Sequence, residues 1–188
     1  MTFTDVAYYQ EKFSKLKSSN EIIKSREFEE CDFTGCSFIS CTFEKCKFLN
    51  CKFNDCILSA VIPMDCRFLD VKFYKCKVIG MDWTKTQKIQ KLDFNECQIN
   101  YSNFRFLKIP GTVIIKSESK DTDFTEADLH DGDFKNTDFE RSRFLKLTYP
   151  TPTLREPQII QLTQLITYLR KPAFLYLRRY PYWIVWIL

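Results

Sequence analysis

The chain contains little glycine and a single histidine, and both shortages restrict its function. Gly accounts for 4 of the 188 residues, and no glycine-rich stretch has the spacing of a phosphate-binding loop. With His130 as the one histidine, the sequence lacks the Ser/His/Asp set or Cys/His pair that nucleophilic catalysis requires. The sequence therefore predicts a protein that is not an enzyme and that holds no cofactor and no metal.

Long apolar segments and a secretory leader are also missing. The uninterrupted apolar run at 182–188 has seven residues, whereas a transmembrane helix needs about twenty. The first residues, Met1–Asp5, do not combine a basic segment with an apolar core as a signal peptide does. A membrane protein is therefore disfavoured, and we expect a cytoplasmic protein with reduced thiols.

Cysteine is abundant, but its spacing does not indicate a metal site. Zinc sites use paired spacings such as C-x2-C, whereas seven of the 9 cysteines recur at multiples of five between Cys31 and Cys66. Such spacing places consecutive cysteines on different faces of a coil. We interpret all of them as small hydrophobic residues that fill a repeated core position.

The main feature is a large residue at every fifth position with a small residue two places before it. A period of five fits neither an α-helix nor a flat strand, but it fits a coil that turns a corner every five residues. The first block runs from Arg26-x-Phe28 through Cys31-x-Phe33, Cys36-x-Phe38, Cys41-x-Phe43, Cys46-x-Phe48, Cys51-x-Phe53, Cys56-x-Leu58, Cys66-x-Phe68, Val71-x-Phe73 and Cys76-x-Val78 to Met81-x-Trp83.

A second block repeats the pattern. It includes Leu92-x-Phe94, Cys97-x-Ile99, Ser102-x-Phe104, Leu107-x-Ile109, Thr122-x-Phe124, Ala127-x-Leu129, Gly132-x-Phe134, Thr137-x-Phe139 and Ser142-x-Phe144, with Tyr149 at the next large position. In this pattern the chain resembles the pentapeptide-repeat family. The resemblance implies an all-β solenoid, a right-handed quadrilateral β-helix of about six coils.

In such a solenoid each coil touches only its neighbours, so aromatic ladders should provide the stability. The scarcity of Gly leads us to expect corners that turn through ordinary backbone conformations rather than positive φ. The expected structural core comprises Phe28, Phe33, Phe38, Phe43, Phe48, Phe53, Phe68, Phe73, Trp83, Phe94, Phe104, Phe124, Leu129, Phe134, Phe139 and Phe144.

Three segments interrupt or flank the repeats. Trp83 and Phe94 are eleven residues apart, which predicts a bulge or loop at 84–91 between blocks 26–83 and 92–149. Residues 1–25 are expected to form an N-terminal cap, with an amphipathic helix from Asp5 to Lys17 that has Val6, Tyr9, Phe13 and Leu16 on one side.

Residues 150–188 form an atypical tail that includes a helical pattern from Pro157 to Leu169 and ends in an aromatic segment. Three interpretations remain open: a membrane anchor, which the short apolar run disfavours; a homodimer or interfacial contact at this end; and a shift of the reading frame near residues 145–155.

Charge provides the remaining indication of function. Residues 26–149 carry a net charge of −1, yet 118–140 alone carry −7, while 45–91 are rich in lysine. Asp before a large residue also serves the corner in this family, so an ordinary solvated face is the alternative interpretation. The candidate partner-binding acidic strip comprises Glu118, Asp121, Asp123, Glu126, Asp128, Asp131, Asp133 and Asp138.

The resemblance also implies a function. Qnr-type relatives are rods of B-DNA size that occupy the DNA-binding groove of type II topoisomerases, so we expect a non-enzymatic DNA mimic. The expected partner is DNA gyrase or topoisomerase IV, with protection against quinolones and no direct nucleic acid binding. A general protein-interaction scaffold is the first alternative, and a peripheral membrane protein held by the tail is the second.

Overall fold

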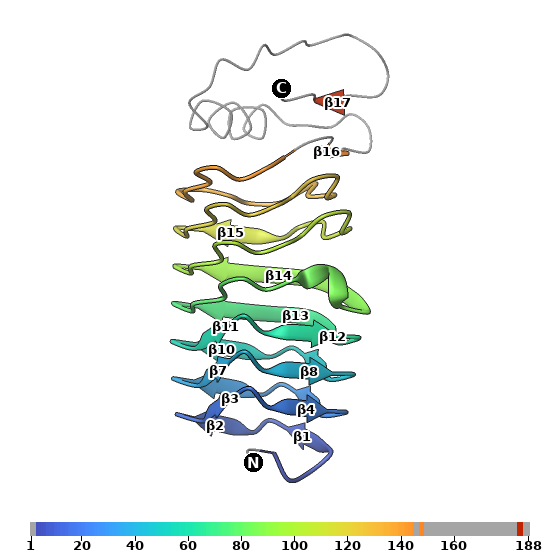
Figure 1. Cartoon of the computed structure of the whole chain (residues 1–188), viewed down its shortest axis with the longest axis vertical. Coiled ribbons are helices and arrows are strands. Elements are labelled where there is room, and N and C mark those ends of the chain that lie inside the picture. Colours follow the sequence, from blue (N-terminus) through green and yellow to red (C-terminus); the bar gives the residue numbers. More distant parts are fainter. Residues whose placement is uncertain (1–2, 145–146, 149–183, 186–188) are drawn as a thin grey trace.

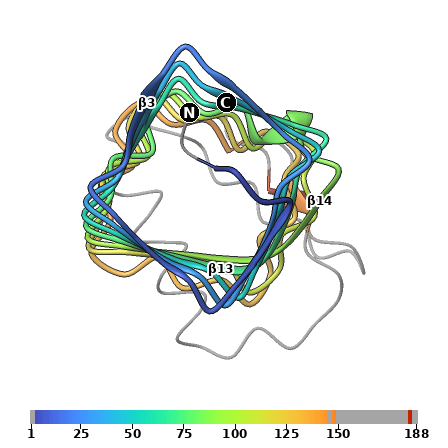
Figure 2. The same cartoon turned by 90° about the horizontal axis from the view of Figure 1, so that it is seen from below.

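The chain winds into a straight rod with a square cross-section (Figures 1 and 2). The structure is a computed structural model that describes residues 3–144, 147–148 and 184–185. Short parallel strands form the sides of the square, and the chain turns a corner between them. The predicted right-handed quadrilateral β-helix is confirmed.

In the first part of the rod most strands have three residues, and each strand forms one side of the square. They are β1 (Ala7–Tyr9), β2 (Lys12–Ser14), β3 (Lys17–Ser19), β4 (Ile22–Lys24), β5 (Glu27–Glu29), β6 (Asp32–Thr34), β7 (Ser37–Ile39), β8 (Thr42–Glu44), β9 (Lys47–Leu49), β10 (Lys52–Asn54), β11 (Ile57–Ser59) and β12 (Ile62–Met64). The later elements are β13 (Arg67–Tyr74), the 3-10 turn η1 (Trp83–Lys85), β14 (Lys88–Asn95), β15 (Val113–Ile115), β16 (Leu147–Thr148) and β17 (Ile184–Val185).

Strands that stack on one another lie twenty residues apart in the sequence. Ala7 pairs with Glu27, which pairs with Lys47 on the next coil. The neighbouring side can be followed along the whole rod through Lys12, Asp32, Lys52, Lys72, Asp93, Val113 and Asp133. Its seven levels are separated by six steps of one coil each.

The expected N-terminal helix is wrong, because residues 7–24 form the first coil. Strands β1 to β4 pair in parallel with β5 to β8. Tyr8, Phe13 and Ile23 take the inward positions, in the same five-residue phase as Phe28. Val6 and Tyr9, which a helix would have buried, are 63% and 60% exposed. Pairing with the next coil outweighs the local helical spacing.

Phe3 closes the N-terminal end of the core. The segment that carries it crosses the open end of the square (Figure 2). Its ring is 2% exposed and lies 5.0 Å from the ring of Phe28 and 5.4 Å from that of Phe13. An aromatic plug therefore covers a cross-section of the core that would otherwise face water.

The extra residue between the two blocks is absorbed at one corner. Arg67 pairs with Lys88, a step of twenty-one residues, and Phe68 pairs with Ile89. The 3-10 turn accommodates the insertion, and Asp82 Oδ1 accepts hydrogen bonds from Thr84 N (3.2 Å) and Thr84 Oγ1 (2.6 Å). The irregular part is thus shorter than the loop expected at 84–91, because residues 88–91 belong to β14.

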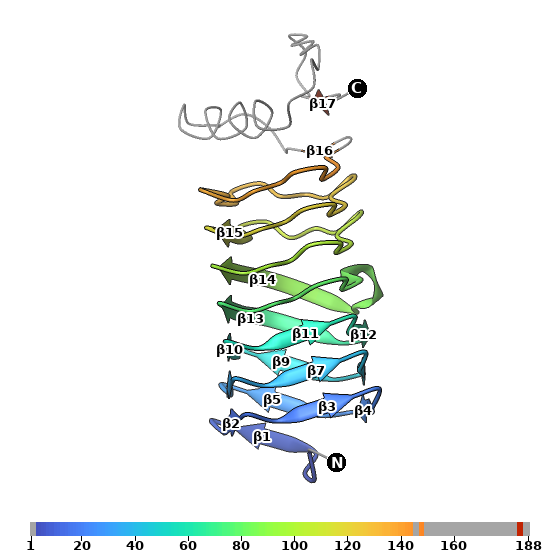
Figure 3. The same ribbon diagram turned by 60° about the vertical axis from the view of Figure 1, so that its left-hand side comes forward.

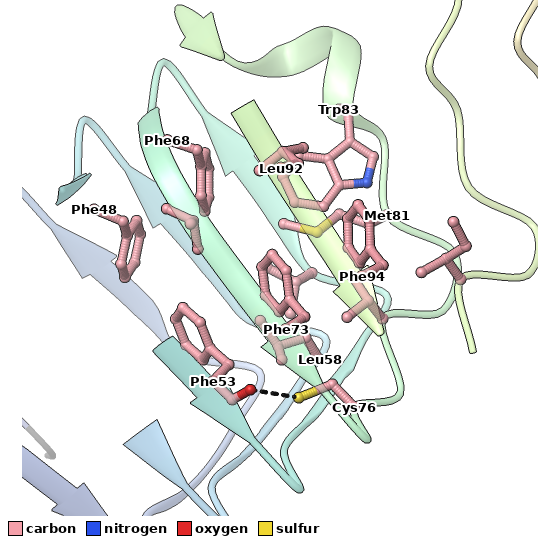
Figure 4. Close-up of a cluster of buried hydrophobic side chains, with 14 of the residues drawn as sticks. Phe48, Phe53, Leu58, Phe68, Phe73, Cys76, Met81, Trp83, Leu92 and Phe94 are labelled. Carbon is pink, nitrogen blue, oxygen red and sulfur yellow. Dashed lines mark hydrogen bonds between the residues drawn. The ribbon is translucent and has the colours of Figure 1, made fainter. Parts of the chain in front are cut away.

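Aromatic rings stack in columns inside the rod (Figure 4). The centroid of Phe53 lies 4.5 Å from that of Phe33 and 5.1 Å from that of Phe73, with nearly parallel planes. Trp83 continues the core past the insertion and stacks on Phe104 at 5.6 Å. Of the sixteen residues expected in the core, Phe134 is half-buried and the other fifteen are buried.

The corners do not use ordinary backbone conformations, so that expectation is wrong. A left-handed residue occurs at every fifth position from Gln10 (φ 54°) to Gly80 (φ 67°) and again from Lys91 to Arg141. Nearly all of them are not glycine, although each such residue costs roughly 1–2 kcal/mol. Hydrogen bonds to the next coil offset this cost, as where Gln10 N donates to Glu29 O and Lys45 N to Met64 O.

Near the C-terminus, β16 and β17 form an antiparallel pair. The predicted helix from Pro157 to Leu169 and most of the 150–188 tail lie outside the described residues. Among the helices that the structure does describe, none has the length and apolar character needed to span a membrane.

Candidate functional site

The outer surface of the rod is the candidate functional site. Within 3–144, the buried polar side chains all belong to Ser and Thr, so every charged side chain is at least partly exposed. On each side of the square, the residues before and after the inward residue point outward, and they stack into columns along the rod. Function therefore depends on how charges and apolar groups are arranged in these columns, which follow the stack of coils drawn in Figure 3.

The eight residues of the predicted acidic strip form a ring around the rod rather than a stripe along it. Asp123, Asp128 and Asp133 bridge to Asn103, Lys108 and Val113, which lie on three successive sides of the square. Glu118 and Asp138 stack on the remaining side, one coil apart. The negative charge is thus concentrated in about one coil near the C-terminal end of the described rod.

Several carboxylates of this ring hold the backbone. Asp123 Oδ1 accepts a hydrogen bond from Thr125 N at 2.9 Å, and Asp138 Oδ1 accepts one from Glu140 N at 3.0 Å. Asp128 and Asp133 do the same for His130 N and Lys135 N at 3.3 Å. These are Asx turns, so each of the four aspartates has a local structural role.

Nearby cations neutralise part of the ring. Arg141 contacts Asp121 through two hydrogen bonds of 2.7 and 2.8 Å, and this pairing lowers the pKa of the Asp121 carboxyl. Lys120 Nζ lies 3.0 Å from Asp138 Oδ2. By contrast, the Asp131 side chain is 76% exposed, and His130 Nε2 lies 3.9 Å from its Oδ2.

His130 lies between two carboxylates on the outside of the rod. Its Nδ1 is 2.6 Å from Asp128 Oδ1, and its side chain is 33% exposed. Within the described part of the chain, no group of three His, Cys, Asp or Glu side chains is arranged to hold a metal ion.

The small inward residues have a role beyond filling space, which the sequence analysis missed. Cys76 Sγ lies 3.3 Å from the carbonyl oxygen of Phe53 on the preceding coil (Figure 4), and Cys56 N lies 3.3 Å from Cys76 Sγ. Burial raises the pKa of the Cys51 thiol to about 12, so this thiol stays protonated and can donate. All nine cysteines are free and buried.

Hydroxyl groups take over this role in the second block. Thr122 Oγ1 donates to Ile99 O at 3.1 Å, and Thr137 Oγ1 donates to Ile114 O at 2.7 Å. Thiols and hydroxyls thus link the same corners to the coil below. The shared preference for Cys, Ser and Thr at these positions is the sequence signal that could have revealed the hydrogen bonds.

Two exposed aromatic residues at corners were also missed. Tyr101 and Phe106 are 65% and 59% exposed, and both have left-handed backbones, with φ of 59° and 60°. The guanidinium of Arg105 lies 5.0 Å from the centroid of the Phe106 ring. Both residues lie at positions that the repeat assigns to corners, so their place could have been read from the spacing.

The fold and its filled core define a repeat protein of the β-helix class. The family model described as "Pentapeptide repeat region" matches residues 26–104, and the one described as "Pentapeptide repeats (8 copies)" matches residues 116–144. Together they match more than half of the chain. The chain belongs to the pentapeptide-repeat family.

Solved structures of other proteins are similar to this chain. QnrB1, a plasmid-mediated fluoroquinolone resistance protein, matches with 16% identity and a TM-score of 0.48, over 87% of this chain and 98% of that one. Rfr23 from the cyanobacterium Cyanothece 51142 matches with 7% identity and a TM-score of 0.34, over 74% and 91% of the two chains. At such identities the similarity concerns the fold alone. No curated protein matches the chain.

Proposed function

We propose that the protein acts without catalysis, by binding another protein through the outside of its rod. The observation that supports this proposal is the filled interior: the described coils bury aromatic, aliphatic and thiol side chains and leave every charged group at the surface. A rigid rod of this kind offers a preformed surface that loses little conformational entropy on binding.

The partner we propose is DNA gyrase or topoisomerase IV, with protection against quinolones as the consequence. The acidic ring supports this choice because a groove that binds DNA is built to neutralise phosphates. Since the acids form a ring, the rod would enter such a groove with its C-terminal coils rather than along its length. The nine free, buried thiols support the expected cytoplasmic location.

A supercoiling assay tests the proposal. The purified protein should relieve fluoroquinolone inhibition of gyrase or topoisomerase IV, and Glu118→Gln with Asp131→Asn should weaken this effect. Neither residue accepts an Asx-turn hydrogen bond in the structure, so the change removes charge and leaves the corners intact.

The matched control is Glu11→Gln with Glu29→Gln, which removes the same charge from the first coils and should retain the effect. If the wild-type protein changes neither enzyme, with or without the drug, the topoisomerase assignment is wrong.

A scaffold that binds a different protein is the second candidate. The ion pairs of Arg141 with Asp121 and of Lys120 with Asp138 favour it, because they reduce the field that a basic groove would meet. A pull-down with the full chain would identify such a partner. Repeating it with the same two charge variants would show whether the partner binds the C-terminal coils or the first coils.

A further inference from the structure

A column of cations runs along one side of the rod through its middle coils. Lys47, Arg67 and Lys88 are direct register partners on β9, β13 and β14. Lys108 follows after another twenty residues, the step that pairs Asp93 with Val113, and it bridges to Asp128 above. At roughly 4.8 Å for each coil, the four cations span about 14 Å.

These cations have few partners in the protein itself. Lys47 Nζ lies 2.5 Å from Glu27 Oε1, and Arg67 Nε donates to the neutral Gln87 Oε1 at 2.5 Å. Among the residues that the structure describes, Lys88 and Lys108 form no ion pair. Like charges in register on neighbouring strands repel one another, so an anionic ligand along the column would relieve a repulsion that the fold leaves in place.

The corner beside this column carries an exposed aromatic ring. Phe106 lies two residues before Lys108, and Lys85 lies on the same corner one coil below. The Phe106 side chain is 59% exposed and its backbone is left-handed. A bulky residue is unfavourable in this conformation, and the ring lies beneath the exposed Arg105 guanidinium, 5.0 Å from its centroid, so burial does not explain its presence.

We propose that this side of the rod binds single-stranded nucleic acid. Phosphates would lie along Lys47, Arg67, Lys88 and Lys108, and an unpaired base would stack on the Phe106 ring. A positive track combined with an exposed aromatic platform is the arrangement that binds single strands without regard to sequence. A duplex would offer the same phosphates but keep its bases stacked inside, and an acidic peptide offers no nucleobase for the ring.

This inference does not depend on the proposed protein-binding function. It uses another part of the surface, since the column lies in the middle coils and the acidic ring lies near the C-terminal end. It also revises the expectation that the rod does not bind nucleic acid directly. The resemblance to Qnr-type relatives implied that expectation, whereas the coil separates charges of the two signs in space.

Fluorescence anisotropy with a labelled oligo-dT strand and the full chain tests the proposal over a salt series. For four phosphate contacts, the slope of log K against log salt concentration should be roughly −2.8. Lys88→Gln with Lys108→Gln removes two contacts and should reduce that slope by about 1.4. Lys12→Gln with Lys17→Gln makes the same charge change on the first coil and should leave the slope unchanged.

The aromatic contact has its own variant. Phe106→Leu keeps an apolar side chain but removes the ring, and it should weaken binding by about 5- to 150-fold with the salt slope unchanged. Circular dichroism would verify that each variant keeps the fold.

Three results would overturn the proposal. One is the absence of binding at low salt, and another is binding to a duplex that is as tight as to the single strand. The third is equal competition by polyglutamate together with no effect of Phe106→Leu, which would assign the column to an acidic protein instead.

Discussion

The lower and upper coils of the rod build the same square in different ways. Up to Tyr74, each side is a strand that pairs through three residues with at least one neighbouring coil. From Lys77 onwards, most sides touch the next coil through one bridging residue, and β15 is the one three-residue strand in the described upper coils. The aromatic columns continue through both parts, so the core does not cause the difference.

The residue before each inward side chain accounts for much of this difference in strand pairing. In the upper coils this residue is often Asp or Asn, and its oxygen takes the N–H two positions later, as Asn103 does for Arg105 N at 3.1 Å. That N–H group therefore no longer donates a hydrogen bond to the neighbouring coil. Asp32 nevertheless belongs to a regular strand, which pairs with β2 and β10. Strand pairing on both sides can therefore prevail over the side-chain hydrogen bond.

The largest expected effect tests whether the shared core is equally important in both parts. Phe53→Ala removes a ring stacked between two others and should lower the free energy of unfolding by about 3–5 kcal/mol. Phe134→Ala should cost less, because that ring is half-buried and lies 6.1 Å from the ring of Phe139, farther than Phe53 lies from its stacked neighbours. Urea denaturation would measure both. Equal losses would show that burial in the upper coils is as important as in the lower ones.

The next effect concerns the hydrogen bonds by which inward thiols and hydroxyls link one coil to the coil below. Thr122→Val keeps the shape but leaves the carbonyl of Ile99 without its hydroxyl donor, at a cost of about 1–3 kcal/mol. Cys51→Ala removes a thiol, which is a weaker donor, and should cost less. The same denaturation series measures both. If the thiol proves equally important, the distinction between the two kinds of link disappears.

A smaller effect should separate structure from charge in the acidic ring. Asp123→Ala removes the acceptor for Thr125 N and should cost about 0.5–1.5 kcal/mol, whereas Asp123→Asn keeps an acceptor and should cost little. Thermal unfolding compares the two. If Asn is as destabilising as Ala, the negative charge and not the Asx turn supports this corner.

The smallest effect is a dependence on pH. Pairing with Arg141 lowers the pKa of Asp121, so the ion pair stabilises the fold above the ordinary pKa of Asp and is lost as the pH falls through the lowered value. The urea midpoint should therefore decrease as the pH falls below the ordinary Asp pKa of about 3.9, and Asp121→Asn should flatten this decrease. The control is Asp55→Asn, which should leave the decrease in place, because this corner aspartate of the lower coils forms no ion pair among the described residues.

The spacing of five predicted the fold and the inward positions because every coil imposes the same geometry on its neighbours. It did not reveal the first coil, because Glu11 and Glu21 occupy positions where later coils have small residues. The left-handed corners were missed because scarce glycine suggests the opposite, and only the hydrogen bonds to the next coil explain them.

The candidate site was harder to predict than the fold. Residues 118–140 form an acidic segment in the sequence, but a coil of twenty residues wraps such a segment around the axis. Its members therefore face different directions, and the cations that neutralise them come partly from the next coil, as Arg141 does for Asp121. Stripes along the rod arise instead from residues twenty apart, such as Lys47 and Arg67.

The one-residue insertion at η1 has a consequence for how such chains diversify. A codon gained inside a side of the square would turn every later inward residue outward, whereas a codon gained at this corner leaves Phe73 in register with Phe94. Corners are thus the places where the gene can change length without disturbing the rest of the protein. Alignments that assume an unbroken period of five would misplace everything beyond that point.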